Sequence, residues 1–327
     1  MKPMSQLYPL LLMPEFHERV WGTRDLAPIY SRIVGKEPIG EAWLTGEQCK
    51  VANGPFSGTT LAELCQRFGR ELVGATSPEA NRFPLLIKFL FPKQKLSVQV
   101  HPDDDGARAL GLPNGKTECW YVARSVAGAQ VGLGLKQGTT REQFARAIEE
   151  KHAEDLMNWI DVKTGDMIYV DAGTVHAIAP GSILVEAQQN SDTTFRLYDY
   201  GRPRELHVEQ GMRAVREKTA AGKVIRENQN GHDVLVASPY FVVERYNVAE
   251  PKSFTEKEGI SAQILVAVDG AGAVESPGAQ PVAFNRGEAV IIPASVPEFT
   301  VRPQWTLEML RMSVPAEKLP PPKTTLP

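Results

Sequence analysis

The most informative segment of the chain is Gly165-Asp-Met-Ile-Tyr-Val-Asp-Ala-Gly-Thr-Val-His176. It consists of a glycine–acid turn, an apolar run, a turn of small residues and then a polar residue. A weaker copy of this order runs from Gly287 to Glu298, with Glu298 in the place of His176. Short apolar runs between turn residues are typical of strands, and the recurrence of one such unit indicates two related β structures. Because the second copy ends on a glutamate and has no partner motif upstream, we expect it to be a structural repeat without a metal.

The same rhythm of turns and short apolar runs extends over much of the chain and predicts a mainly β protein with two jelly-roll or β-sandwich domains. We expect a larger domain at residues 1–230, a degenerate C-terminal β domain at 231–314 and a proline-rich tail at 315–327. Helical spacing interrupts the pattern at residues 60–73 and about 140–160, which predicts a few helices added to the β core. The clearest predicted strands are Leu85–Phe91, Leu96–Val100, Met167–Val170, Ile183–Ala187, Tyr240–Val248, Gln263–Val268 and Ala289–Ile292.

The composition excludes several classes of function. With 36 basic and 39 acidic residues in 327, the formal charge is -3, so no overall positive field exists to attract nucleic acid or an anionic membrane. No apolar run reaches the length that crosses a bilayer, and the early run from Leu7 to Met13 lacks the flanks of a signal peptide. The three cysteines are widely spaced, which favours neither a disulfide framework nor a cysteine zinc site. We therefore expect a cytoplasmic protein that holds any anionic ligand locally.

Polar side chains converge from three predicted strands. Alternation along the strand places Ser97, Gln99 and His101 on one face, with valines on the other. The same alternation places Lys116, Glu118 and Trp120 on one face of a second strand and turns Cys119 into the core. Two imidazoles, a carboxylate and an amide suit a divalent metal of the zinc type with a position left open. The candidate ligands are Gln99, His101, Glu118 and His176, with Gln99 the least usual as a zinc ligand.

A third polar segment runs from Glu186 to Arg202. We predict that Arg196, Tyr198 and Tyr200 share one face of a strand, where the arginine would pair with an oxyanion or a phosphate. The sequence lacks the glycine-rich and nucleophile-elbow motifs of dinucleotide-binding proteins and serine hydrolases. Four histidines lie outside any paired motif, and we expect surface or structural roles for them: His17, His152, His207 and His232.

These motifs, taken in order, resemble the type I phosphomannose isomerases, in particular the short bacterial form. The resemblance covers roughly the first two thirds of the chain and departs from the family pattern at Thr23. Its segments are Trp21-Gly22, Ile39–Trp43, Leu96–Asp103, Gly115–Trp120, Gly173–His176, Gln188–Arg196 and Arg204–His207.

The resemblance implies a cupin fold and a zinc-dependent aldose–ketose isomerase that interconverts mannose 6-phosphate and fructose 6-phosphate through a cis-enediol. It implies one Zn²⁺ per chain on the four candidate ligands. Lys116 matches a lysine considered for proton transfer, Arg196 matches the active-site arginine, and Ser97 matches a serine linked to the substrate phosphate. A zinc ion with one carboxylate leaves a local charge near +1, to which Lys116 and Arg196 would add, so an anionic sugar phosphate suits the site.

The sequence leaves both the catalytic base and the class of function open. The base could be Lys116, a metal-bound hydroxide, or an unligated histidine or carboxylate. A metal-dependent cupin oxygenase would also use two histidines and a carboxylate, with iron. A cupin that binds a sugar phosphate without turning it over is a third reading. The sequence does not indicate an oligomeric state.

Overall fold

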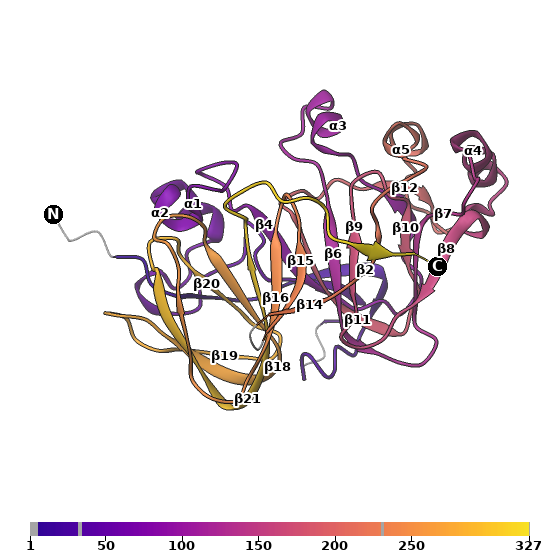
Figure 1. Cartoon of the computed structure of the whole chain (residues 1–327). Coiled ribbons are helices and arrows are strands. Elements are labelled where there is room, and N and C mark those ends of the chain that lie inside the picture. The colour runs from indigo at the N-terminus through magenta and orange to yellow at the C-terminus, as the bar shows by residue number, and fades with distance from the viewer. Residues whose placement is uncertain (1–5, 32–34, 230–231, 327) are drawn as a thin grey trace.

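The computed structural model describes residues 6–31, 35–229 and 232–326 (Figure 1). The domain boundary predicted at residues 230 and 231 lies outside these ranges. The described residues form antiparallel sheets with short helices at their margins, as the turn rhythm predicts. All seven predicted strands are present. The ends of six of them differ from the prediction by no more than a few residues, and the strand predicted at Gln263–Val268 continues to Glu275.

Two sheets form a sandwich that carries most of the predicted site residues. Within the described residues, the eight-stranded sheet has the order β2 (Glu15–Thr23), β3 (Ile39–Trp43), β4 (Leu85–Leu90), β11 (Ser182–Gln189), β6 (Glu118–Ser125), β9 (Met167–Val170), β13 (Gly222–Val224) and β22 (Thr324–Thr325). The five-stranded sheet has the order β12 (Phe195–Tyr198), β5 (Val98–Val100), β10 (His176–Ile178), β7 (Gln130–Leu135) and β8 (Met157–Asp161).

Apolar side chains from the two sheets fill the space between them. Trp120 and Ile168 come from the eight-stranded sheet, and Leu133 and Ile178 from the five-stranded one. Each of these side chains is 1% exposed or less. Burial of this inner layer fixes the distance between the sheets, and the polar site residues lie at one end of it.

A third sheet covers the outer face of the eight-stranded one. It contains β1 (Leu10–Leu12), β20 (Ala289–Ile292), β18 (Gln263–Glu275), β21 (Glu298–Ser313), β16 (Val242–Val248), β15 (His232–Ala237) and β14 (Glu227–Gln229), with β17 (Lys252–Thr255) on β21 and β19 (Val282–Asn285) on β18. The sheet curls on itself (Figure 1). One apolar cluster lies within it, and a second cluster packs it against the larger domain. The eight-stranded sheet is thus covered on both faces, which explains why every residue of β4 is buried.

The two sequence ends of the described chain cross between the domains. β1, near the N-terminus, pairs with β20 of the C-terminal sheet, with Leu11 opposite Val290. β22, in the proline-rich segment, pairs with β13 of the larger domain, with Thr324 opposite Val224. The segment predicted as a tail therefore contributes a strand to the eight-stranded sheet.

The helices agree with the predicted positions in part. At residues 60–73, α1 (Leu61–Phe68) begins with a capping box between Thr60 and Glu63, and Gly69 at φ 50° separates it from α2 (Arg70–Val73). At residues 140–160, Thr140 caps α4 (Arg141–Glu149), and a 3₁₀ turn (Ala153–Leu156) follows. The prediction is wrong from residue 157 on, because β8 begins there and its ladder with β7 overrides a helix. Three short helical elements were not predicted: a 3₁₀ turn (Gly54–Phe56), α3 (Asp104–Ala109) and α5 (Val208–Ala214).

None of the helices in the described ranges is long and apolar enough to cross a membrane. The three cysteines are buried and free.

Candidate metal centre and active site

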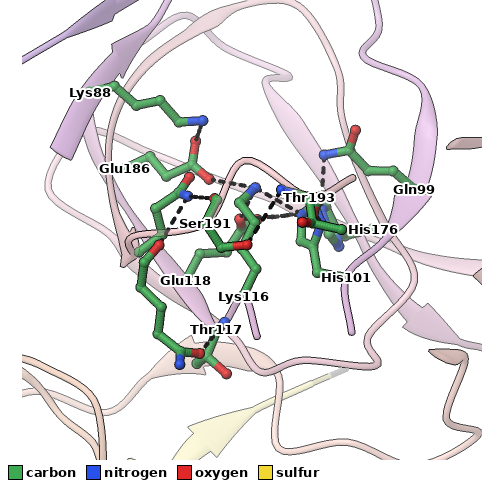
Figure 2. Close-up of polar contacts among 12 residues, drawn as sticks. Lys88, Gln99, His101, Lys116, Thr117, Glu118, His176, Glu186, Ser191 and Thr193 are labelled. Carbon is green, nitrogen blue, oxygen red and sulfur yellow. Dashed lines mark hydrogen bonds and ion pairs between the residues drawn. The ribbon is translucent and has the colours of Figure 1, made fainter. Parts of the chain in front are cut away.

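Three of the four candidate ligands converge on one point between the sheets (Figure 2). One donor atom from each of His101, Glu118 and His176 lies within 4.8 Å of the other two. His101 follows β5, Glu118 begins β6 and His176 begins β10, and each side chain is 1% exposed. Residues far apart in sequence thus present two nitrogens and a carboxylate to the same buried volume.

The two imidazoles are oriented by backbone carbonyls. His101 donates Nδ1–H to the Thr193 carbonyl at 2.8 Å, and His176 donates Nδ1–H to the Thr174 carbonyl at 2.9 Å. Both Nε2 atoms then carry lone pairs, and they lie 3.4 and 3.3 Å from the Glu118 carboxylate. Burial lowers the pKa of both histidines, so the neutral imidazoles are favoured. This is the second-sphere arrangement that orients histidine ligands for a divalent metal, so the residues fit such an ion.

Gln99 lies beside His176 across the β5–β10 pair, as the predicted ligand set requires. Its Nε2 is 3.1 Å from His176 Nε2, and its Oε1 accepts a hydrogen bond from the Ser97 hydroxyl at 3.2 Å. The amide therefore presents nitrogen to the centre, and its oxygen would reach a metal after a half-turn of the carboxamide. Amide oxygen and nitrogen are assigned from such networks, so Gln99 keeps its candidate role.

Lys116 lies against the same centre. Its Nζ is 2.8 Å from Glu118 Oε2, 3.0 Å from His101 Nε2 and 3.7 Å from Glu186 Oε1. Lys116, Glu118 and Trp120 all line one cavity, whereas Cys119 packs in the apolar core. The face predicted from strand alternation is therefore confirmed for this segment.

A buried ionic network next to Lys116 was not predicted as part of the site. Lys88 Nζ, in β4, is 3.2 Å from Glu186 of β11 and 4.0 Å from Glu41 of β3. Arg19 Nη2 binds the same Glu41 carboxylate at 2.9 Å. The available signal was Lys88 itself, because a lysine inside the apolar run Leu85–Leu90 must find a partner or leave the core.

The carboxylates of Glu118 and Glu186 have opposite environments. Burial favours the neutral form of both, but the charge of Lys116 outweighs it for Glu118 and lowers the pKa of that carboxyl. For Glu186, burial and the charge of Glu118 together raise the pKa above the ordinary range. A low-pKa carboxylate suits a metal ligand, and a raised one next to it suits proton transfer.

Arg196 also lines the cavity and lies opposite Gln99 in the β12–β5 pair. Its Nη1 donates to the Glu205 carbonyl at 2.7 Å, while its buried Nε has no hydrogen-bond partner among the described residues. The His207 backbone N–H binds the Arg196 carbonyl at 2.7 Å. His207 therefore has the structural role expected for it, next to the arginine and outside the candidate ligand group.

Two further arginines pair with one buried carboxylate, Asp199, in the segment that follows Arg196. Arg204 donates both Nε and Nη2 to Asp199 at 2.6 Å, and Arg202 approaches the same carboxylate at 2.7 Å. Burial and then the charge of Arg204 lower the pKa of Arg196. Arg204 lines the cavity, and sequence reasoning missed it because only the folded loop brings it back beside Arg196.

The prediction that Arg196, Tyr198 and Tyr200 share a face is wrong. The β12–β5 register shifts between Arg196 and Tyr198, so Tyr198 pairs with Val98. Both tyrosines pack with the apolar cluster on the outer face of the five-stranded sheet, and β12 ends at Tyr198. A bulge thus separates the arginine from the tyrosines.

The cavity between these groups has a volume of about 340 Å³, which is in the usual range for a small-molecule site. Ser97, Gln99, Lys116, Glu118 and Arg196 are among its lining residues.

Comparison with known proteins agrees with this geometry. Residues 10–149 match the family described as phosphomannose isomerase type I, catalytic domain, and residues 232–311 match the mannose-6-phosphate isomerase cupin domain. The chain is 35% identical over 310 residues to the probable mannose-6-phosphate isomerase GmuF of Bacillus subtilis, covering 90% of this chain and 96% of that protein. The chain belongs to the type I phosphomannose isomerase family. The resemblance drawn from the motifs is therefore confirmed.

Two further members of the family extend the comparison. Mannose-6-phosphate isomerase ManA of B. subtilis is 34% identical over 306 residues, covering 89% of this chain and 95% of that protein. The crystal structure of a mannose 6-phosphate isomerase from B. subtilis matches with a TM-score of 0.82 at 32% identity, covering 93% of this chain and 99% of that one. This likeness, with the family match at 232–311, confirms the predicted mainly β, cupin-type fold. In the weak sequence repeat, Glu298 is an exposed residue at the start of β21.

Proposed function

We propose that the protein is a mannose-6-phosphate isomerase that converts mannose 6-phosphate to fructose 6-phosphate and back through a cis-enediol. The reaction would use one Zn²⁺, held by His101, Glu118, His176 and the amide oxygen of Gln99. The observation that carries the proposal is the buried convergence of two oriented imidazoles and a carboxylate on the cavity that also holds Lys116. The family membership supplies the reaction.

The donor set favours zinc on chemical grounds. Neutral imidazole nitrogens with one carboxylate are common zinc ligands in enzymes, and an open position remains for substrate. When bound, the ion would polarise the sugar carbonyl and stabilise the negative charge that develops on its oxygen. The protein supplies the rest of the chemistry.

Proton transfer between C2 and C1 needs a base beside both carbons. In the proposed direction, the base takes the proton from C2 of the open-chain aldose while the C1 oxygen gains a proton, which gives the enediol. Return of a proton to C1 and loss of one from the C2 oxygen then yields the ketose. Lys116 and Glu186 are the candidates, because their Nζ and Oε1 atoms are 3.7 Å apart in the cavity wall.

The phosphate would bind at Arg196. Lys88 and Arg19, which line the same cavity, are already paired with Glu186 and Glu41. Arg202 and Arg204 share the Asp199 carboxylate, and Arg196 forms no ion pair within the described residues, which leaves positive charge beside the cavity. We propose that Arg196 and Arg204 bind the phosphate, with the Ser97 hydroxyl, which lines the same cavity, as a further donor. A small phosphorylated sugar in the cytoplasm, where the free thiols stay reduced, is the partner that this site suits.

A coupled assay for fructose 6-phosphate formation from mannose 6-phosphate tests the proposal. One preparation is assayed as purified, after chelation, and after addition of Zn²⁺, with metal content measured at each step. We expect turnover that disappears with the metal and returns with Zn²⁺. Stoichiometric zinc without turnover would overturn the isomerase function, and full turnover in the metal-free protein would overturn the proposed centre.

A further inference from the structure

The side-chain contacts of Lys116 would change when a metal binds. Its closest side-chain partners, His101 Nε2 and Glu118 Oε2, belong to the proposed ligands of the metal. A bound cation would take the Nε2 lone pair of His101 and repel the ammonium group, which weakens both contacts. The position of Lys116 in the working enzyme then depends more on Glu186, 3.7 Å away, and on the backbone that carries the lysine.

That backbone precedes β6 and is held by groups from two other segments, residues 102–104 and Gln189. The N–H of Gly115 binds Asp104 Oδ1 at 2.9 Å, and the N–H of Lys116 binds the Pro102 carbonyl at 2.9 Å. The N–H of Thr117, drawn beside Lys116 in Figure 2, binds the side-chain oxygen of Gln189 at 2.9 Å. Gly115 is packed so closely that a Cβ there would lie 2.5 Å from the Asp103 carbonyl carbon.

The hydrogen bonds to the N–H groups of Gly115 and Thr117 are connected through their acceptors. Gln189 is 8% exposed, and it donates Nε2–H to Asp104 Oδ1 at 2.9 Å while its Oε1 binds Thr117. One carboxylate oxygen thus holds Gly115 directly and orients the amide that holds Thr117. The two flanks of Lys116 depend on a single pair of side chains.

The C-terminal domain reaches the same pair. Tyr240 lies between β15 and β16, and its side chain lines the same cavity as Asp104 and interacts with that carboxylate. Burial first, and then the negative charge of Asp104, raise the pKa of Tyr240 to about 12, so the phenol stays protonated and able to donate. Asp104, Gln189 and Tyr240 all line a second cavity of about 590 Å³, and none of them lines the proposed substrate cavity.

We infer that Asp104 and Gln189, braced by Tyr240 of the C-terminal domain, are positioning residues that fix the Lys116 backbone for proton transfer. The inference rests on the proposed isomerase function for its kinetic consequence, and on hydrogen bonding alone for its structural one. Because these residues do not contact the substrate cavity or the metal ligands' side chains, their loss should change turnover more than binding. Displacement of a catalytic group by about 1 Å can cost about 100-fold in rate.

The kinetic test compares Asp104→Ala with Asp104→Asn and with Asp105→Ala, an exposed neighbour on the same helix whose carboxylate pairs with Arg108. For Asp104→Ala we expect kcat to fall about 10- to 100-fold, with KM within about threefold and the metal content unchanged. Asparagine keeps the Oδ1 acceptor, so Asp104→Asn should recover to within about fivefold of wild type. Asp105→Ala should behave as wild type.

Tyr240→Phe gives a milder version with a matched control. Tyr8→Phe likewise removes a phenol hydroxyl, and this one binds the Asn53 carbonyl and the Phe56 N–H away from the site. We expect kcat to fall about threefold to tenfold in Tyr240→Phe and to stay unchanged in Tyr8→Phe. An Asp104→Ala protein with wild-type kcat, or an Asp104→Asn protein as impaired as the alanine variant, would overturn the inference.

Hydrogen exchange provides a readout that does not need activity. In folded Asp104→Ala protein, the amides of Gly115 and Thr117 should exchange about tenfold faster than in wild type, and in Asp105→Ala they should not. Unchanged exchange in Asp104→Ala would refute the positioning role of Asp104 even if kcat fell. Wild-type protein without turnover in the same assay would refute the isomerase function, while the exchange result would still decide the positioning role of Asp104.

Discussion

Replacement of Glu41 by glutamine tests how strongly the buried network next to the cavity stabilises the fold. Glu41 is 8% exposed and accepts hydrogen bonds from Arg19 at 3.1 and 2.9 Å and from Trp43 Nε1 at 2.7 Å. Burial alone would raise the pKa of Glu41, but Lys88 and Arg19 outweigh it and lower the pKa from 4.5 to about 2. A depression of that size corresponds to about 3 kcal/mol of stability at pH 7. Glutamine has the shape of glutamate without its charge, so we expect the free energy of unfolding to fall by about 2–3 kcal/mol.

The matched control is Glu47→Gln. Glu47 pairs with Arg82 at 2.8 Å, nearly the same distance, but its side chain is 45% exposed. Water screens that pair, so its loss should cost less than about 1 kcal/mol. Urea unfolding, followed by both tryptophan fluorescence and far-UV circular dichroism at a fixed zinc concentration, gives the free energies of unfolding where the two probes coincide.

The pH dependence has a defined sign. A carboxyl whose folded-state pKa is depressed contributes its full stabilisation above the unfolded pKa of 4.5 and loses it as the pH falls toward 2. The difference between wild type and Glu41→Gln should therefore be about 1 kcal/mol smaller at pH 4 than at pH 7. Equal losses in the Glu41 and Glu47 variants, or a difference that grows on acidification, would refute the reasoning.

Three further substitutions test other parts of the molecule. His176→Ala should lose most of the bound metal and nearly all turnover, whereas His207→Ala should keep its metal by elemental analysis; equal metal loss would remove His176 from the ligand set. Lys88→Met leaves Glu186 buried without its closest cation and should cost about 3–5 kcal/mol in unfolding free energy, against less than about 0.5 kcal/mol for the exposed Lys218→Met. Gly22→Ala places a Cβ 2.4 Å from the Ile39 carbonyl carbon and should lower the unfolding free energy by about 1–3 kcal/mol; an unaffected urea midpoint would contradict this packing.

Local patterns predicted much of the fold because local chemistry determines it. The capping box between Thr60 and Glu63 starts α1 where the sequence placed a helix, and strand alternation sorts Glu118 from Cys119 correctly. The β12 bulge could not be foreseen, since it depends on the register against β5, and it reversed the prediction for Tyr198. The helix predicted for residues 140–160 was wrong from residue 157 on for the same reason, because pairing with β7 makes that segment a strand.

The candidate site was predictable where its residues sit in motifs and hidden where folding alone assembles them. Gln99, His101, Glu118 and His176 stood out by type and spacing, and the fold brings them together. Glu186 gained its place through contacts with residues distant in sequence, such as Lys116. Arg204 gained its place through a loop that returns it to the cavity, and Lys88 showed only as a charge in an apolar run. A single sequence contains no direct record of such partners.

The exchange of β1 and β22 between the two sheets has a consequence for how the chain matures. The β13 edge of the eight-stranded sheet is covered by residues Thr324–Thr325. These residues leave the ribosome about 100 residues after β13 itself. The N-terminal strand β1 must in turn wait for Ala289–Ile292 before it finds its partner. During synthesis both domains therefore carry an open strand edge, which favours aggregation until the partner strand has been made. Separately expressed halves would each lack a strand supplied by the other, so we expect the two domains to fold as one unit.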